Sequence, residues 1–120
     1  MSPVPAGVVA REFAPGDVIF RQGADPRGEA FLIHAGRVEV RRRMRGAERV
    51  VRVLCRGELL GELALFRGTV HSASAIALES VTLLVVPAGS LHRLVRTSPA
   101  LAVALIRQLA LRLREAEDGG

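Results

Sequence analysis

Short apolar runs separated by glycine- and proline-rich turns fill the first two-thirds of the chain, and this pattern predicts strands. Residues 11–20 are the first example, because the Pro15-Gly16 pair suits a type II turn between two strands. Phe13, Val18 and Phe20 of these strands are expected in the core. Val51 and Val53 are expected on one face of a later strand. The later strands are expected at residues 30–36, 37–43, 48–54, 72–78 and 81–86, with a hairpin tip at 44–47.

The last third of the chain changes to a helical period. Ser90 is expected to cap a short helix over Leu91–Arg96, and Ser98-Pro99 is a typical helix start for a longer one. About eight strands followed by helices predict a mainly β fold, namely a β-roll or jelly-roll (double-stranded β-helix) with short flanking helices and a C-terminal α-helix. The expected layout of this one domain, residues 1–120, is a loosely ordered arm at 1–10, the roll at 12–87 and the helices at 90–116.

The composition argues against a membrane-spanning protein, a signal peptide and a disulfide-bonded fold. No apolar run approaches the ~20 residues of a membrane helix, and the N-terminus lacks the basic start of a signal peptide. Cys55 is the single cysteine of the sequence and cannot form an internal disulfide, so it is expected to be a small buried thiol in the cytoplasm.

The basic charge is concentrated in one predicted hairpin. Between Arg37 and Arg56 there are eight arginines and two glutamates, a balance of 8 − 2 = +6. The Arg41–Arg45 run could contact nucleic acid phosphates, but no aromatic residues interleave with it, and a solvated strand edge is the favoured interpretation. No metal site is expected at His34 or His92, and no pairing of nucleophile and base or of carboxylates suggests an enzyme.

The segment with the most specific chemistry is residues 57–75. Gly61 allows close approach of the backbone to a ligand, and Glu62 can accept hydrogen bonds from a hydroxyl group. The N–H groups at the start of the short helix that follows suit an anion such as phosphate. His71 and Ser72 could return to the same anion from the other side.

This segment resembles the phosphate-binding cassette of the cyclic nucleotide-binding domain family. The matching residues are Gly61-Glu62-Leu63-Ala64-Leu65 and His71-Ser72-Ala73, and the opening strands match as well. The resemblance implies that Glu62 holds a ribose 2′-hydroxyl. It also implies that backbone N–H groups near Glu62, Leu63 and Ala73, with the Ser72 side chain, hold the cyclic phosphate of cAMP or cGMP. Val51 is expected among the pocket residues that influence base selection.

His71 departs from the family pattern, which has arginine at this position. A neutral imidazole offers one donor and no permanent charge, whereas arginine offers a charged, two-pronged donor. The exchange is expected to weaken phosphate binding by about tenfold or more. Arg67 or Arg56 could supply the charge, although solvated loop arginines are the favoured interpretation.

The expected function is a regulatory module that binds a cyclic nucleotide, uses no other cofactor and signals through its last helix. The apolar stripe of that helix is also the expected surface of a homodimer. The alternatives are a degenerate domain that serves as a scaffold for dimerisation or protein contacts, and the sensor part of a transcription regulator. DNA binding is not expected of this chain alone, because no room for a helix-turn-helix remains after Glu115.

Overall fold

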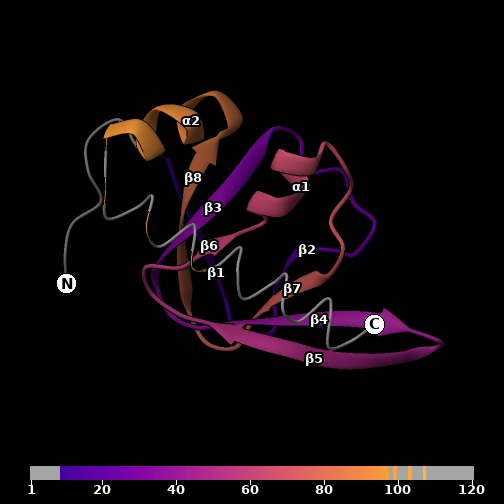
Figure 1. Ribbon diagram of the computed structural model, residues 1–120. Coiled ribbons are helices and arrows are strands. Elements are labelled where there is room, and N and C mark those ends of the chain that lie inside the picture. Colours follow the sequence, from indigo (N-terminus) through magenta and orange to yellow (C-terminus); the bar gives the residue numbers. More distant parts are fainter. Residues whose placement is uncertain (1–8, 98, 100–102, 104–106, 108–120) are drawn as a thin grey trace.

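Two four-stranded antiparallel sheets form the protein, as a computed structural model shows (Figure 1). The structure describes residues 9–97 together with 99, 103 and 107. The first sheet has the strand order β1-β8-β3-β6 and the second β2-β7-β4-β5, which is a jelly-roll arrangement of eight strands. The first sheet consists of β1 (Ala10–Phe13), β8 (Val81–Pro87), β3 (Glu29–Ala35) and β6 (Leu59–Leu60). The second consists of β2 (Val18–Phe20), β7 (Ser74–Ala77), β4 (Val38–Met44) and β5 (Ala47–Leu54).

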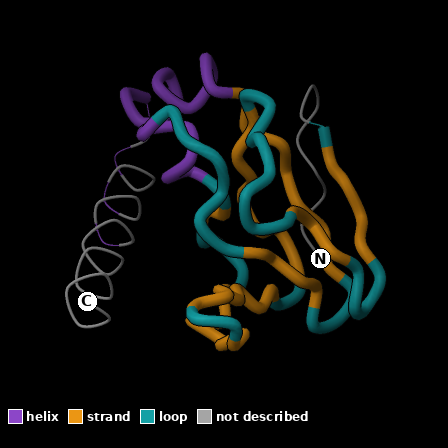
Figure 2. The backbone as a smooth tube through the Cα atoms, turned by 90° about the vertical axis from the view of Figure 1, so that its right-hand side faces the viewer, coloured by secondary structure: helices purple, strands orange, loops and turns teal. Residues whose placement is uncertain are grey.

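Two short helices, α1 (Glu62–Arg67) and α2 (Ala88–Thr97), complete the described fold. Both lie at the end of the roll away from the β4–β5 hairpin (Figures 1 and 2). The expected helix from Pro99 to Glu115 lies largely outside the described residues. No helix in the described part of the chain is long and apolar enough to cross a membrane.

The core lies between the two sheets and contains aliphatic side chains almost exclusively. Each fully buried Val, Leu or Ile contributes about 1.5–3 kcal/mol through removal of its apolar surface from water. β7 contributes two small side chains, Ala75 and Ala77, to this core. The buried cluster includes Ile33, Val38, Leu54, Val81 and Leu83 together with Ala73, Ala75 and Ala77.

Turn chemistry confirms two predicted connections. Gly16 has φ 87°, as the second central position of a type II turn requires, and the Asp17 N–H donates to the Ala14 carbonyl at 3.0 Å. At the β4–β5 tip, Arg45 and Gly46 have φ 53° and 80°, which are the signs of a two-residue type I′ turn.

Two expectations about β5 and the turn after it are wrong. Arg52 pairs with Val40 and Val50 with Arg41, so Val51 is an extra residue in a β-bulge. Val51 packs against the core while Val53 is 46% exposed, and the two valines therefore do not share a face. Cys55, expected to be buried, is an exposed free thiol in the turn that follows β5.

The other differences concern element ends. α2 begins at Ala88 and contains Ser90, which therefore does not cap a helix starting at Leu91. Apolar residues of the strand before it, β8, are buried or half-buried as predicted until Pro87. β1 begins at Ala10, slightly before the expected start of the roll. Phe13 and Phe20 pack against the core as expected, whereas Val18 is 39% exposed.

Candidate functional site

The segment that leads into α1 is held in place by a glycine with left-handed backbone geometry. Gly61 has φ 79° and ψ 4° and directly precedes the helix. A Cβ atom at this position would lie 3.1 Å from His71 Cε1 and 3.3 Å from Phe20 Cε2. Gly61 is therefore required both for its backbone conformation and for close approach to the two rings.

Glu62, the first residue of α1, is completely buried, with 0% of its surface exposed. Glu62 and His71 are the only buried polar or charged side chains among the described residues. Because burial of a carboxylate costs several kcal/mol, this position is unusual for a residue that serves only to begin a helix. A glutamate that only stabilises a helix start at the protein surface would not show this burial.

His71 lies flat against Phe20. The ring centroids are 3.6 Å apart and the planes differ by 8°, and only 5% of the His71 surface is exposed. Its main chain is fixed on both sides, because the His71 N–H donates to the Ala24 carbonyl at 2.9 Å and the Gly23 N–H donates to the His71 carbonyl at 2.8 Å. Burial lowers the pKa of His71, and the charge of Asp25 opposes this only in part. The imidazole is therefore neutral at pH 7.

A small hollow of about 30 Å³ lies between the start of α1 and the segment before β7. Six of the eight predicted site residues meet there. Glu62, which is fully buried, and Val51, which packs against the core, are not among the lining residues. A hollow of this size holds about one water molecule. Its walls are Phe20, Val40, Leu60, Gly61, Leu63, Ala64, His71, Ser72 and Ala73.

Three wall residues, Phe20, Val40 and Leu60, were missed by sequence reasoning as site residues. Each is an apolar residue of a strand, which indicates only that the side chain faces the interior. The pattern does not show that this part of the interior opens to a ligand site. The Phe20–His71 contact in particular joins residues distant in sequence, and the backbone hydrogen bonds of His71 with Gly23 and Ala24 help to bring them together.

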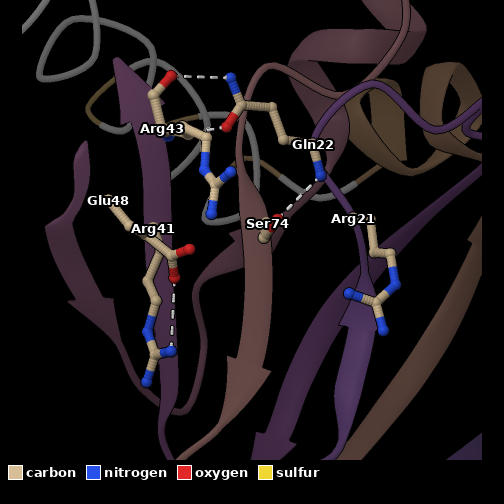
Figure 3. Close-up of a pocket in the computed structure, with 6 residues that line it drawn as sticks. All are labelled: Arg21, Gln22, Arg41, Arg43, Glu48 and Ser74. Atoms are coloured by element: carbon tan, nitrogen blue, oxygen red, sulfur yellow. Dashed lines mark hydrogen bonds and ion pairs between the residues drawn. The ribbon is translucent and has the colours of Figure 1, made fainter. Parts of the chain in front are cut away.

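A second, larger hollow of about 450 Å³ lies on the outer face of the β2-β7-β4-β5 sheet (Figure 3). The Gln22 amide holds its edge together, because Gln22 Oε1 accepts from the Arg43 N–H at 2.7 Å and Gln22 Nε2 donates to the Arg43 carbonyl at 3.3 Å. The Gln22 N–H also donates to Ser74 Oγ at 2.8 Å. The lining residues are Arg21, Gln22, Arg41, Arg43, Glu48 and Ser74.

Ion pairing occupies part of this outer hollow. Arg41 pairs with Glu39 and lies 3.4 Å from a Glu48 oxygen, and these carboxylates raise the pKa of Arg41. Exposed pairs of this kind contribute little to stability, about 0–1 kcal/mol each. In the described part of the chain, no group of three or more His, Cys, Asp or Glu is placed to hold a metal ion.

Comparison with known proteins gives the family. A family model described as "Cyclic nucleotide-binding domain" matches residues 10–98. The cyclic AMP receptor protein of Thermus thermophilus is 38% identical over 108 residues, which cover 89% of this chain and 50% of that protein. This chain thus spans half the length of that curated relative.

Two solved structures, of a catabolite activator protein and of an EAL enzyme bound to cAMP, are also similar to this chain. The structure of the Thermus thermophilus catabolite activator protein is similar, with a TM-score of 0.76 and 36% identity, over 92% of this chain and 52% of that one. A cAMP-bound form of the EAL enzyme Bd1971 has a TM-score of 0.69 and 31% identity, over 92% of this chain and 29% of that one. The chain belongs to the cyclic nucleotide-binding domain family.

Proposed function

We propose that this domain binds the phosphate of a cyclic nucleotide, cAMP or cGMP, at the hollow between the start of α1 and residues 71–73. The observation that carries the proposal is that Gly61, His71, Ser72 and Ala73 line one hollow although nine residues of helix and loop lie between Gly61 and His71. Because the chain belongs to the cyclic nucleotide-binding domain family, a cyclic nucleotide is the expected ligand of this hollow.

In this proposal each residue has a distinct task. Backbone N–H groups near Leu63 and Ala73 donate to the phosphate oxygens, and the exposed Ser72 hydroxyl adds a side-chain donor. The Glu62 carboxylate accepts a hydrogen bond from the ribose 2′-hydroxyl. For this purpose the buried Glu62 side chain must become accessible when the ligand enters.

Entry of the ligand requires the hollow to enlarge. Pockets for small molecules typically occupy about 300–1,000 Å³, whereas this hollow measures about 30 Å³. The His71 ring fills the space beside Gly61 and must leave Phe20. Loss of an aromatic stack costs about 0.5–1.5 kcal/mol, which weakens binding by about two- to tenfold.

His71 also lowers the expected affinity through its missing charge. A neutral donor replaces a charge-assisted one, and this exchange costs about a further tenfold. Together the two effects predict a weak, reversible nucleotide site, which suits a sensor of fluctuating ligand concentration.

The proposal also covers how the domain signals and how it forms a dimer, and both involve residues outside the described part of the chain. We place the response in the helix from Pro99 onward, which follows α2 and carries the apolar stripe of a homodimer surface. The module acts in the cytoplasm as a binding domain rather than an enzyme, with Val51 influencing base selection from the core side. Any activity of a larger protein that contains the domain depends on its other parts.

A titration calorimetry experiment tests the proposal. The wild-type chain should bind cAMP or cGMP with one site per chain, and Glu62→Gln should weaken binding because a carboxylate accepts a hydroxyl hydrogen bond more strongly than an amide. His71→Arg should tighten binding about tenfold. Absence of heat with both nucleotides at millimolar concentration would contradict the proposal.

The second candidate is a degenerate domain that serves as a scaffold without a small ligand. The observation that favours it is the closed hollow, in which the domain's own His71 and Phe20 rings occupy the space for a ligand. Sedimentation analysis that shows a stable dimer, in a chain that binds neither nucleotide, would select this function instead.

A further inference from the structure

β4 carries three consecutive arginines, and the structure divides them between the two faces of the sheet. Arg41 and Arg43 line the outer hollow, and Figure 3 shows Arg43 next to Gln22 and Arg41 next to Glu48. Successive side chains of a strand point to opposite faces, so Arg42 points to the inner face, as Val40 does. Arg41 and Arg42 are both half-buried and Arg43 is exposed, but among the three only Arg42 has a buried Nε atom without a hydrogen-bond partner.

Strand alternation brings Arg42 near the hollow at the start of α1, outside the residues that line it. Val40 lines the hollow, and a two-residue step along a strand is about 6.6 Å. Arg42 therefore lies on the same face of β4 as Val40, at about this distance from it. The pairing of β4 with β7 ends at Arg41 and Ser74, next to Ala73, which also lines the hollow. The Arg42 side chain is long enough to span a two-residue step.

The surroundings of Arg42 favour an anion. Its buried Nε atom hydrogen-bonds to no acceptor among the described residues. Arg49 pairs with Arg42 directly across the β4–β5 hairpin, and like charges in this relation repel one another. None of the ion pairs between described residues includes either arginine. A phosphate on the inner face would provide an acceptor for Arg42 and reduce the repulsion.

We propose that Arg42 supplies the positive charge for the ligand phosphate, in place of the guanidinium that position 71 lacks. The inference rests on the proposed nucleotide function and adds a binding residue to it. Arg42 reaches the anion from β4, whereas a residue at position 71 would reach it from the segment before β7. The positive charge that the family pattern places at position 71 is thus supplied here by Arg42 on β4.

Calorimetry with the same cyclic nucleotide tests this inference, with Arg43→Gln as the matched control. Arg43 is the next residue along the strand, carries the same charge and lies on the opposite face. Arg42→Gln should weaken binding about tenfold or more, while Arg43→Gln should change the dissociation constant less than about twofold. Arg42→Lys should keep most of the affinity, and His71→Arg should restore binding to Arg42→Gln.

The outcomes separate the two proposals. Wild-type affinity in Arg42→Gln, or equal losses in Arg42→Gln and Arg43→Gln, would overturn the role of Arg42 and leave the nucleotide function intact. A wild-type chain that binds neither nucleotide would overturn both. Urea denaturation of each variant establishes that it is folded, and Arg42→Lys provides a second test should Arg42→Gln fail to fold.

Discussion

Substitution of Gly61 by alanine should damage the fold and the site together, and Gly57→Ala provides the control. Both glycines have positive φ, 79° at Gly61 and 89° at Gly57, so alanine incurs left-handed backbone strain of about 1–2 kcal/mol at either position. Nothing lies within 4 Å of a Cβ at Gly57. At Gly61 the same Cβ lies 3.1 Å from His71 and 3.3 Å from Phe20.

The magnitude follows from these contacts. The two rings are stacked on one another, so neither can move away from the new methyl group without disturbing the other. Overpacking of this kind costs about 1–3 kcal/mol. The total loss for Gly61→Ala is therefore about 2–5 kcal/mol, against about 1–2 kcal/mol for Gly57→Ala.

Urea denaturation at pH 7.5 measures the difference, since an unchanged slope identifies a change in stability alone. Nucleotide binding provides the second readout. The methyl group of Gly61→Ala enters the hollow and should abolish binding, whereas Gly57→Ala should keep it. Equal losses of stability in the two variants would refute the steric argument, and normal binding by Gly61→Ala would refute the location of the site.

Three further predictions concern other parts of the fold. Gly36→Ala should destabilise by more than about 3 kcal/mol in urea denaturation, because its Cβ would lie 2.3 Å from the Ser80 carbonyl oxygen; a loss of under about 1 kcal/mol would contradict this. His71, whose pKa burial lowers, should make the urea midpoint fall as pH falls below about 6.5, since the unfolded chain then binds a proton that the folded chain does not. His71→Phe should reduce that dependence, and an unchanged slope would assign it to other groups. The pKa of Cys55 is raised chiefly by the charge of Glu58, so Glu58→Gln should speed alkylation of Cys55 at pH 7.5, and an equal or slower rate would contradict this.

Much of the roll could be predicted because each strand carries its own local signals. The Pro15-Gly16 turn, the hairpin tip before Ala47 and the buried run of β8 all depend on residues that are adjacent in sequence. The cassette was likewise visible, since Gly61-Glu62 and His71-Ser72-Ala73 are short contiguous motifs. These features are local, because each is determined mainly by the types of a few residues adjacent in sequence.

The remainder depends on contacts between distant segments. The bulge at Val51 arises from pairing with β4, which shifts register at that point, and an alternating pattern does not reveal it. The stack of His71 on Phe20 joins β2 to the segment before β7, and both rings line the hollow. The inward direction of Arg42 was hidden within a run that suggested only a charged surface.

Backbone amide NMR during titration with cAMP and with cGMP tests the central claim most directly, because it reports where a ligand binds. A nucleotide bound at the hollow should shift the amide signals of Gly61, Leu63, Ser72 and Ala73 in a saturable manner, and Arg42→Gln should require higher ligand concentrations for the same shifts. Saturable shifts confined to the outer face around Gln22, or no shifts at millimolar nucleotide, would contradict the account.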